Sequence, residues 1–257
     1  MTLPSPSVDL LGIRVNVIDP DGVLREIARR IGMPGCALIH NVNVHACNLA
    51  CENPEFRRIL NESAIVFCDG FGVKLGARLL GLRLGKRMTP PDWIDLLLRR
   101  GEAEGWSFYF LGDEPDVLAQ FEAKVRTAYP ALRRVGRSPG FFEVGGSEEE
   151  ALTESIRSAR PDVILTAMGM PRQELWADRA KLRLDHGVVI ATGALFRWYT
   201  GRERRAPKWM SEHGGEGLYR LLRHPVRHFR RYFLGVPCFF FRVMKERFHR
   251  GTTGGPV

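Results

Sequence analysis

The chain contains 257 residues with a formal net charge of +9; 44% of them are apolar and 26% are charged, as in a globular protein with a sizeable core. No run of about 18 apolar residues occurs, and the first residues lack the basic and apolar regions of a signal peptide, which argues against a membrane-spanning or secreted protein. The five cysteines are scattered, and we expect reduced thiols in a cytoplasmic protein.

Strand and helix patterns alternate along the chain. A first strand is predicted at 10–18, and a turn at 19–22 leads into a helix that continues to residue 31. Further strands are predicted at 36–39, 64–68, 106–111, 132–136, 162–167 and 188–192. Helices are predicted between them at about 44–51, 54–61, 71–80, 89–98, 115–129, 147–159 and 172–184. This alternation predicts an α/β fold, with a Rossmann-like, mainly parallel sheet flanked by helices and right-handed crossovers.

A strand, a tight turn and a helix surround Asp69. The apolar stretch Ala64–Cys68 stops at Asp69-Gly70, and a helical pattern follows at once. In open α/β sheets, ligands bind at the carboxyl ends of the strands. Gly70 and Gly72 allow backbone N–H groups to approach a ligand closely, and the N-terminus of the new helix favours an anion. The sequence therefore predicts a ligand site at Asp69.

Three other strand ends carry polar residues or glycine turns and should meet Asp69 at the same edge. They contribute Asn41 and Asn43, then Gly112 with the adjacent Asp113, and finally the segment 169–173, which begins with Gly169 and ends with Gln173. Glycine turns at helix N-termini suit a diphosphate group. We therefore expect an anionic, diphosphate-containing ligand.

Two other kinds of site, for a dinucleotide or for zinc, have partial signals in these segments. Gly70, Gly72 and Gly76 resemble a dinucleotide fingerprint, but their spacing is off by one residue. The acidic residue at the expected distance is Asp92, which lies at a helix start and not at a strand end. A zinc site at residues 45–51 lacks a second pair of ligands. Both alternatives are disfavoured.

The positive charge is concentrated in the last part of the chain. Residues 197–250 contain fourteen Lys or Arg and four Glu, whereas residues 1–196 contain 24 basic and 25 acidic side chains. The sequence therefore predicts a near-neutral body at 1–196 and a basic, aromatic-rich appendage at 197–257. The segment 232–241, YFLGVPCFFF, is too short to span a bilayer and is flanked by Arg and Lys, which is typical of an element lying on an anionic membrane surface.

A basic tail with interleaved aromatic residues also fits a nucleic-acid-binding protein. The neutral body and the lack of a helix-turn-helix or RNP-like pattern weigh against nucleic acid as a partner. A membrane scaffold without catalytic activity is a third alternative, and UDP binding would distinguish it from an enzyme.

Five stretches, taken in order, resemble the WecG/TagA/CpsF glycosyltransferases over roughly residues 10–235. They are Asn41–Asn43, the DGFG turn at 69–72, TAMGMPRQELW at 166–176, GRERRAPKWM at 201–210 and GLYRLLRHPVR at 217–227. Members of this family transfer a sugar from a UDP-sugar to a polyprenyl-diphosphate-linked sugar during bacterial surface-polysaccharide synthesis. They invert the anomeric centre and use no metal.

The resemblance implies a UDP-sugar donor, a polyprenyl-diphosphate-linked acceptor, no cofactor, and a peripheral location on the inner face of the cell membrane. The transferred sugar would be N-acetylmannosamine, its uronic acid or glucose. A second copy of the chain, in a homo-oligomer, is a further candidate partner. The product would serve wall teichoic acid, capsule or exopolysaccharide synthesis.

The resemblance also implies roles for individual residues. Asp69 would be the general base that takes the proton from the acceptor hydroxyl, although a helix N-cap is the alternative role. Asn41 stands where family members usually carry Thr, and we expect it beside Asp69 in the catalytic group. Asn43 and Gln173 would bond sugar hydroxyls or the diphosphate, unless they only cap loops. The turn glycines would also contact substrate: Gly70, Gly112 and Gly169.

Arginines of the appendage match those that complete the family's active site. Arg220, Arg227 and Arg230 would neutralise the leaving UDP, because guanidinium suits phosphate, or would instead form a solvated or membrane-facing basic surface. One position departs from the family pattern: Arg197 replaces an acidic residue that helps to hold the nucleotide. We therefore expect different nucleotide contacts on that side of the site.

Overall fold

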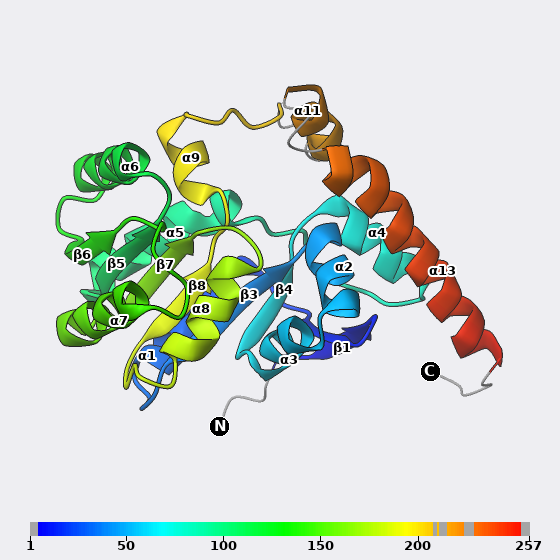
Figure 1. Cartoon of the computed structure of the whole chain (residues 1–257), viewed down its shortest axis with the longest axis horizontal. Helices are drawn as coiled ribbons and strands as arrows, with labels where there is room; N and C mark the ends of the chain where they lie inside the picture. The colour runs from blue at the N-terminus through cyan, green and yellow to red at the C-terminus, as the bar shows by residue number, and fades with distance from the viewer. Residues whose placement is uncertain (1–4, 208–209, 211–214, 224–228, 253–257) are drawn as a thin grey trace.

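The computed structural model describes residues 5–207, 210, 215–223 and 229–252 (Figure 1). Its centre is a six-stranded sheet with the strand order β4-β3-β8-β7-β5-β6, and every neighbouring pair in it is parallel. This confirms the predicted α/β fold. The strands are β3 (Ala37–Val42), β4 (Ile65–Cys68), β5 (Ser107–Gly112), β6 (Arg133–Ser138), β7 (Val163–Ala167) and β8 (Val188–Ala191).

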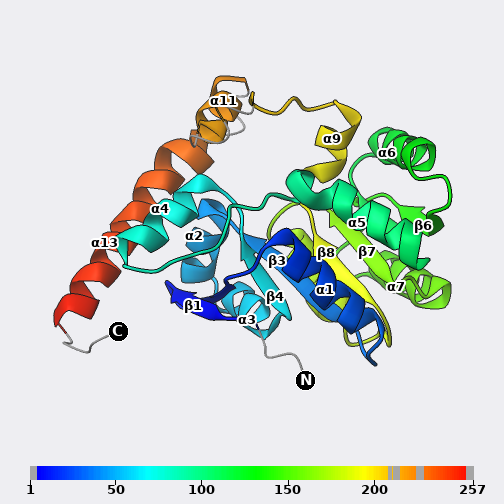
Figure 2. The ribbon, with the colours of Figure 1, turned by 180° about the vertical axis from the view of Figure 1, so that it is seen from behind.

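Helices cover both faces of the sheet. On the face seen in Figure 2 lie α1 (Pro20–Ile31), α5 (Pro90–Glu104) and α6 (Pro115–Ala128). On the face seen in Figure 1 lie α2 (Val44–Glu52), α3 (Pro54–Glu62), α7 (Ser147–Ala159) and α8 (Arg172–Ala180). Further helical elements are α4 (Phe71–Leu79), α9 (Leu195–Thr200), α11 (Glu216–Arg223), the short π-helical turn η1 (Arg230–Leu234) and α13 (Gly235–Thr252).

Local caps start several helices at the predicted places. Asp19 accepts a hydrogen bond from the Gly22 N–H at 2.8 Å at the start of α1, and Asn53 caps α3 in the same way. Thr89 and Asp92 form a capping box at the start of α5. Proline follows each of these caps, where its missing N–H costs no helical hydrogen bond. The positions of these helix starts are therefore encoded locally.

The first predicted strand is in fact a hairpin. Strands β1 (Ser7–Leu10) and β2 (Ile13–Asn16) pair antiparallel, and Leu11 and Gly12 between them both have positive φ, at 55° and 80°. The prediction of one strand at 10–18 was wrong because the apolar alternation continues across this turn. Asn16 Oδ1 accepts the Val66 N–H at 2.8 Å, which ties the hairpin to the outer strand β4.

Helix α13 packs on α2 and α4 at the β4 side of the sheet (Figure 1). Phe239 and Val243 are fully buried there, and a Cβ at Gly76 would lie only 2.5 Å from Phe239 Cζ. Asn48 Nδ2 donates to the Gly235 carbonyl at 2.7 Å, and Arg242 donates to the Asn48 carbonyl at 2.9 Å. Part of the apolar surface of the appendage thus belongs to the protein core. No helix in the described ranges is long and apolar enough to cross a membrane.

His40 on β3 gives a pH dependence that stability measurements can test. Its ring is fully buried, and neither nitrogen has a hydrogen-bond partner among the described residues. Burial lowers its pKa from 6.5 to about 3, so below 6.5 the unfolded chain binds a proton that the folded chain excludes. Folding stability is therefore lost as the pH falls, by about 2 kcal/mol between pH 7 and pH 5.

We expect His40→Leu to remove this dependence, so that the variant gains stability over the parent as the pH is lowered. Thermal unfolding of both proteins across this range measures the difference. The matched control is His249→Leu on α13, where the imidazole is exposed. Parallel curves for the parent and His40→Leu would contradict the prediction.

Candidate active site

Asp69 lies at the carboxyl end of β4, where the chain turns into α4. Its N–H donates to the Val42 carbonyl at 2.8 Å, so its backbone is fixed to the end of β3. Gly70 follows with φ 106° and ψ 151°, a conformation that other residues rarely adopt, and no side chain caps the first turn of α4. The positive end of α4 therefore lies beside the Asp69 carboxylate.

A cavity of about 290 Å³ opens beside this turn, and we call it the Asp69 cavity. Asn43 and His45 line it from the start of α2, and Arg87 lines it from the loop before α5. The appendage supplies the remaining wall, with Gly217, Arg231, Tyr232, Val236 and Phe240. Five segments far apart in sequence thus meet at this edge of the sheet.

Asn43 caps α2 and also lines the Asp69 cavity. Its Oδ1 accepts the Ala46 N–H at 3.1 Å, and its Nδ2 is turned toward Met170 Sδ at 3.9 Å. Asn41, by contrast, lies within β3, which extends to Val42, and its Nδ2 donates to the Ala191 carbonyl of β8 at 2.9 Å. Asn41 is buried and does not line the cavity.

A second cavity of about 260 Å³, which we call the Asp113 cavity, lies at the ends of β5, β7 and β8. Asp113, Gly169, Arg172 and Arg197 line it. Gly169 has φ 76°, and a Cβ there would meet no atom within 4 Å, so its backbone borders open space. Gly112 has a packing role: a Cβ at this position would lie 2.5 Å from the Ala167 carbonyl oxygen.

Arg197 makes ion pairs with two acidic residues at the end of β5. It lies 2.8 Å from Asp113 Oδ1 and 2.9 Å from Glu114 Oε1. The Asp113 side chain is only 4% exposed, and its backbone has φ 58°, a region in which Asp is among the more common residues. The charge introduced by Arg197 is thus balanced inside the protein, and both signs of charge face the Asp113 cavity.

Gln173 joins the loops that follow β7 and β8. Its Nε2 donates to Glu174 Oε1 at 2.8 Å, while its Oε1 accepts the Gly193 N–H at 3.2 Å. Both Gln173 and Glu174 are fully buried, and burial raises the pKa of Glu174 to about 7. Gln173 therefore braces the wall of the Asp113 cavity from behind, since Gly193 lines that cavity.

Sequence reasoning missed several residues of these sites, and three of them carry charged side chains that the site uses. Arg87 and Arg231 bring guanidinium groups to the Asp69 cavity, and Glu174 bonds to Gln173. Arg87 also lies 3.4 Å from Asp92. A usable signal existed only for Glu174, an acidic residue on the helix face that also carries the apolar Ala177 three positions later. The described residues contain no group of three His, Cys, Asp or Glu placed to hold a metal ion.

The three predicted appendage arginines cannot be placed in the cavity. Arg227 lies outside the described residues. Arg220 falls in α11 and Arg230 in η1, and for these two residues the structure describes the backbone course only. Among the appendage residues whose side chains are described, Arg231, the neighbour of Arg230, lines the Asp69 cavity.

Comparison with known proteins identifies the same family that the sequence motifs resemble. Residues 8–253 match the family described as "Glycosyl transferase WecG/TagA/CpsF family". The chain belongs to this family. The resemblance seen in the sequence motifs is thereby confirmed, and the protein is a glycosyltransferase.

Two Bacillus proteins are similar along most of their length, and both are named N-acetylglucosaminyldiphosphoundecaprenol N-acetyl-beta-D-mannosaminyltransferase. The Bacillus subtilis protein is 28% identical over 216 residues, which cover 84% of this chain and 82% of the relative. The Bacillus spizizenii protein is 26% identical over 197 residues, which cover 77% and 74%.

Proposed function

We propose that this glycosyltransferase moves N-acetylmannosamine from a UDP-sugar to a polyprenyl-diphosphate-linked N-acetylglucosamine, for a cell-surface polymer such as teichoic acid. The observation that carries the proposal is the Asp69 cavity, which a carboxylate and two arginines line together at the carboxyl edge of a parallel sheet. The names of the two Bacillus relatives favour N-acetylmannosamine over its uronic acid or glucose.

In the proposed reaction Asp69 is the general base. Its carboxylate accepts the proton of the acceptor hydroxyl while that oxygen attacks the anomeric carbon of the donor sugar. The new C–O bond forms as the bond from the anomeric carbon to the UDP phosphate breaks, and the electron pair leaves with UDP. Attack from the side opposite the leaving group inverts the anomeric centre.

The charge that develops on the UDP phosphate needs stabilisation. Arg87 and Arg231 line the Asp69 cavity, and guanidinium groups bind phosphate oxygens in a bidentate manner. The uncapped first turn of α4 offers backbone N–H groups in the same place. We assign leaving-group stabilisation to these groups and propose no metal in this role.

The two cavities suit the two ends of a UDP-sugar. Asn43 lines the Asp69 cavity and contacts Met170, which lies next to Gly169 of the Asp113 cavity. We place the sugar and its anomeric carbon beside Asp69 and the nucleotide in the Asp113 cavity. There, the carboxylate of Asp113 can accept hydrogen bonds from ribose hydroxyls, and Arg172 offers a positive charge.

The appendage also suits a lipid-linked acceptor. Apolar side chains of α13 face outward beside basic ones: Phe241 is 71% exposed and Phe248 69% exposed, and Lys245 lies between them in sequence. Exposed aromatic groups flanked by basic residues are typical of an element that lies on an anionic membrane. We propose that α13 docks the enzyme on the inner face of the cell membrane, where the acceptor is anchored.

Thermal unfolding in the presence of candidate ligands tests the donor class. We expect UDP to stabilise the protein, by about 2.7 kcal/mol at a concentration roughly 100-fold above its dissociation constant. A chelator should leave this shift unchanged. GDP, NAD and short oligonucleotides serve as controls; stabilisation by NAD or an oligonucleotide without any response to UDP would contradict the proposal.

A further inference from the structure

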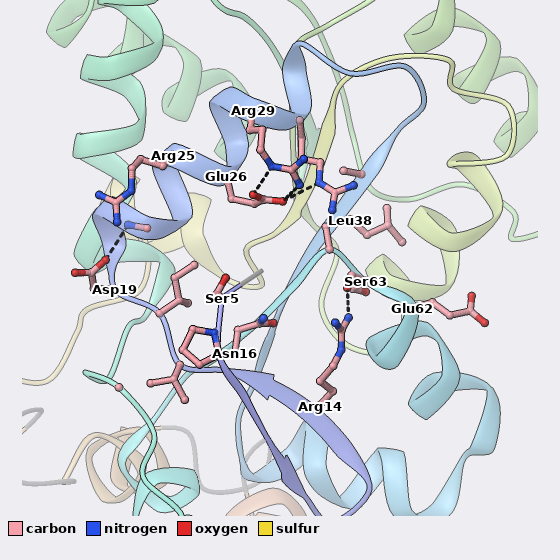
Figure 3. A pocket seen from close by; sticks show the side chains of 18 of the residues that line it. Ser5, Arg14, Asn16, Asp19, Arg25, Glu26, Arg29, Leu38, Glu62 and Ser63 are labelled. Carbon is pink, nitrogen blue, oxygen red and sulfur yellow. Dashed lines mark hydrogen bonds and ion pairs between the residues drawn. The ribbon is translucent and has the colours of Figure 1, made fainter. Parts of the chain in front are cut away.

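A large cavity lies at the end of the sheet opposite to Asp69. It has a volume of about 1050 Å³ and is bordered by the β1–β2 hairpin, α1 and the first residues of β3 (Figure 3). Ala64, which precedes β4, lines this cavity, whereas Asp69 follows β4. The five residue steps from Ala64 to Asp69 span roughly 16 Å along the sheet. The two cavities share no lining residue, although Lys86 of this one is the chain neighbour of Arg87 in the Asp69 cavity. We call this cavity the amino-edge cavity.

The amino-edge cavity is basic although the body of the protein is not. Residues 1–196 carry one more acidic than basic side chain. The cavity lining nevertheless contains six basic side chains and only three acidic ones, Asp19, Glu26 and Glu62. The basic ones are Arg14, Arg25, Arg29, Arg30, Lys86 and Lys181. The fold thus gathers positive charge at this place.

The three acidic side chains are already engaged. Glu26 accepts hydrogen bonds from Arg29 Nε at 2.7 Å and Arg30 Nε at 2.8 Å. Asp19 caps α1, and Glu62 lies 2.6 Å from Arg58. Arg25 and Lys86, in contrast, have no hydrogen-bond or ion-pair partner within the described part of the chain. Two charges therefore remain available to a ligand, with further guanidinium N–H groups on Arg30 and Arg14 beside them.

Close packing fixes the walls of the cavity. Arg14 Nη2 donates to the carbonyls of Ser63 at 2.6 Å and Asn61 at 3.0 Å, which holds the hairpin against the start of β4. A Cβ at Gly85 would lie 3.1 Å from the Ile18 carbonyl oxygen, so the loop carrying Lys86 lies directly on the backbone of the opposite wall. Figure 3 shows Arg25, Glu26 and Arg29 along α1, with Arg14 on the hairpin side. The cavity is therefore formed without a ligand.

We propose that the amino-edge cavity binds a soluble anion that carries two or more phosphate groups. Arginine and lysine side chains converging from separate walls match several phosphates better than a single carboxylate, because each guanidinium can bind two oxygens of one phosphate. Its lining contains neither Asp69 nor any other residue of the Asp69 cavity. It is a binding site separate from catalysis, and the proposal does not depend on the identity of the transferred sugar.

Calorimetric titration of the full chain with inorganic tripolyphosphate, in the presence of saturating UDP, tests this site. We expect binding that is weakened roughly tenfold or more in the double variant Arg25→Ser/Lys86→Ser, since two charge-assisted contacts are lost. The matched control is Arg126→Ser/Arg183→Ser, which removes two exposed arginines elsewhere. Binding in the control should equal that of the parent.

Three results would overturn the proposal. Equal loss in both double variants would mean unspecific attraction to a basic protein, and no loss in either would place the anion elsewhere. Absence of tripolyphosphate binding, together with binding to phosphatidylglycerol vesicles that requires Arg25 and Lys86, would assign the site to lipid headgroups instead of a soluble anion.

Discussion

Replacing Asp69 with Asn is expected to reduce the rate of sugar transfer by roughly 100-fold to 10,000-fold, the range seen when a general base is lost. The amide has the shape of the carboxylate but cannot accept the proton of the acceptor hydroxyl. The backbone hydrogen bond from Asp69 to Val42 does not involve the side chain, so the turn should be retained. Initial rates of transfer at saturating substrates, with UDP binding measured in parallel, give the result.

The specificity of this effect is checked with Asp21→Asn, which removes an exposed carboxylate from the first turn of α1. That variant should transfer sugar at the parental rate. UDP should stabilise the Asp69 variant as it stabilises the parent. If Asp69→Asn retains more than about half of the parental rate, the general base is another group.

A chain that ends at residue 216 is expected to retain a folded body but to lose transfer activity. The truncation removes one wall of the Asp69 cavity, including Arg231, Tyr232 and Phe240. It also exposes the surface on α2 and α4 that Phe239 and Val243 cover, at a cost of about 2 kcal/mol for each side chain. The melting temperature should therefore fall while the circular dichroism spectrum remains that of an α/β protein.

A full-length variant displaces the same wall of the cavity without deleting it. In the variant Gly76→Val, the added side chain would clash with Phe239 and push α13 away from α4. All residues of the appendage are still present in this variant. We expect it to transfer sugar poorly, whereas Lys245→Ser on the exposed side of α13 should be active in a detergent assay. Normal transfer by the truncated chain would show that the appendage is not part of the active site.

The elements with strong local signals were predictable from the sequence. Helix starts marked by a capping side chain and proline, as at Asp19, Asn53 and Thr89, were located to within a residue or two. The buried parallel strands β3, β4, β5, β7 and β8 were found because each is a short apolar run between turns, whereas the edge strand β6 is polar and only partly buried. The hairpin turn at Leu11-Gly12 was missed because leucine is uncommon at positive φ and the apolar alternation continues across the turn.

The site was less predictable than the fold. Strand order places Asp69 and Asn43 side by side, and the rule that ligands bind at the carboxyl edge was enough to select them. The rule does not tell which strand-end residues face the cavity. Asn41 bonds to β8, Gly112 packs on β7 and Gln173 is buried behind the wall, because long-range packing sets the direction of each side chain. Arg87 reaches the Asp69 cavity from a loop without any local signal.

The most direct test of the account is a transfer assay with labelled UDP-N-acetylmannosamine and a synthetic polyprenyl-diphosphate-linked N-acetylglucosamine. We predict a labelled disaccharide on the lipid carrier, with inverted anomeric configuration and one UDP released per sugar, and no product with Asp69→Asn. Absence of product from this donor and acceptor, while the same preparation binds UDP, would contradict the proposed donor–acceptor pair. Product formation that persists with Asp69→Asn would contradict the proposed mechanism.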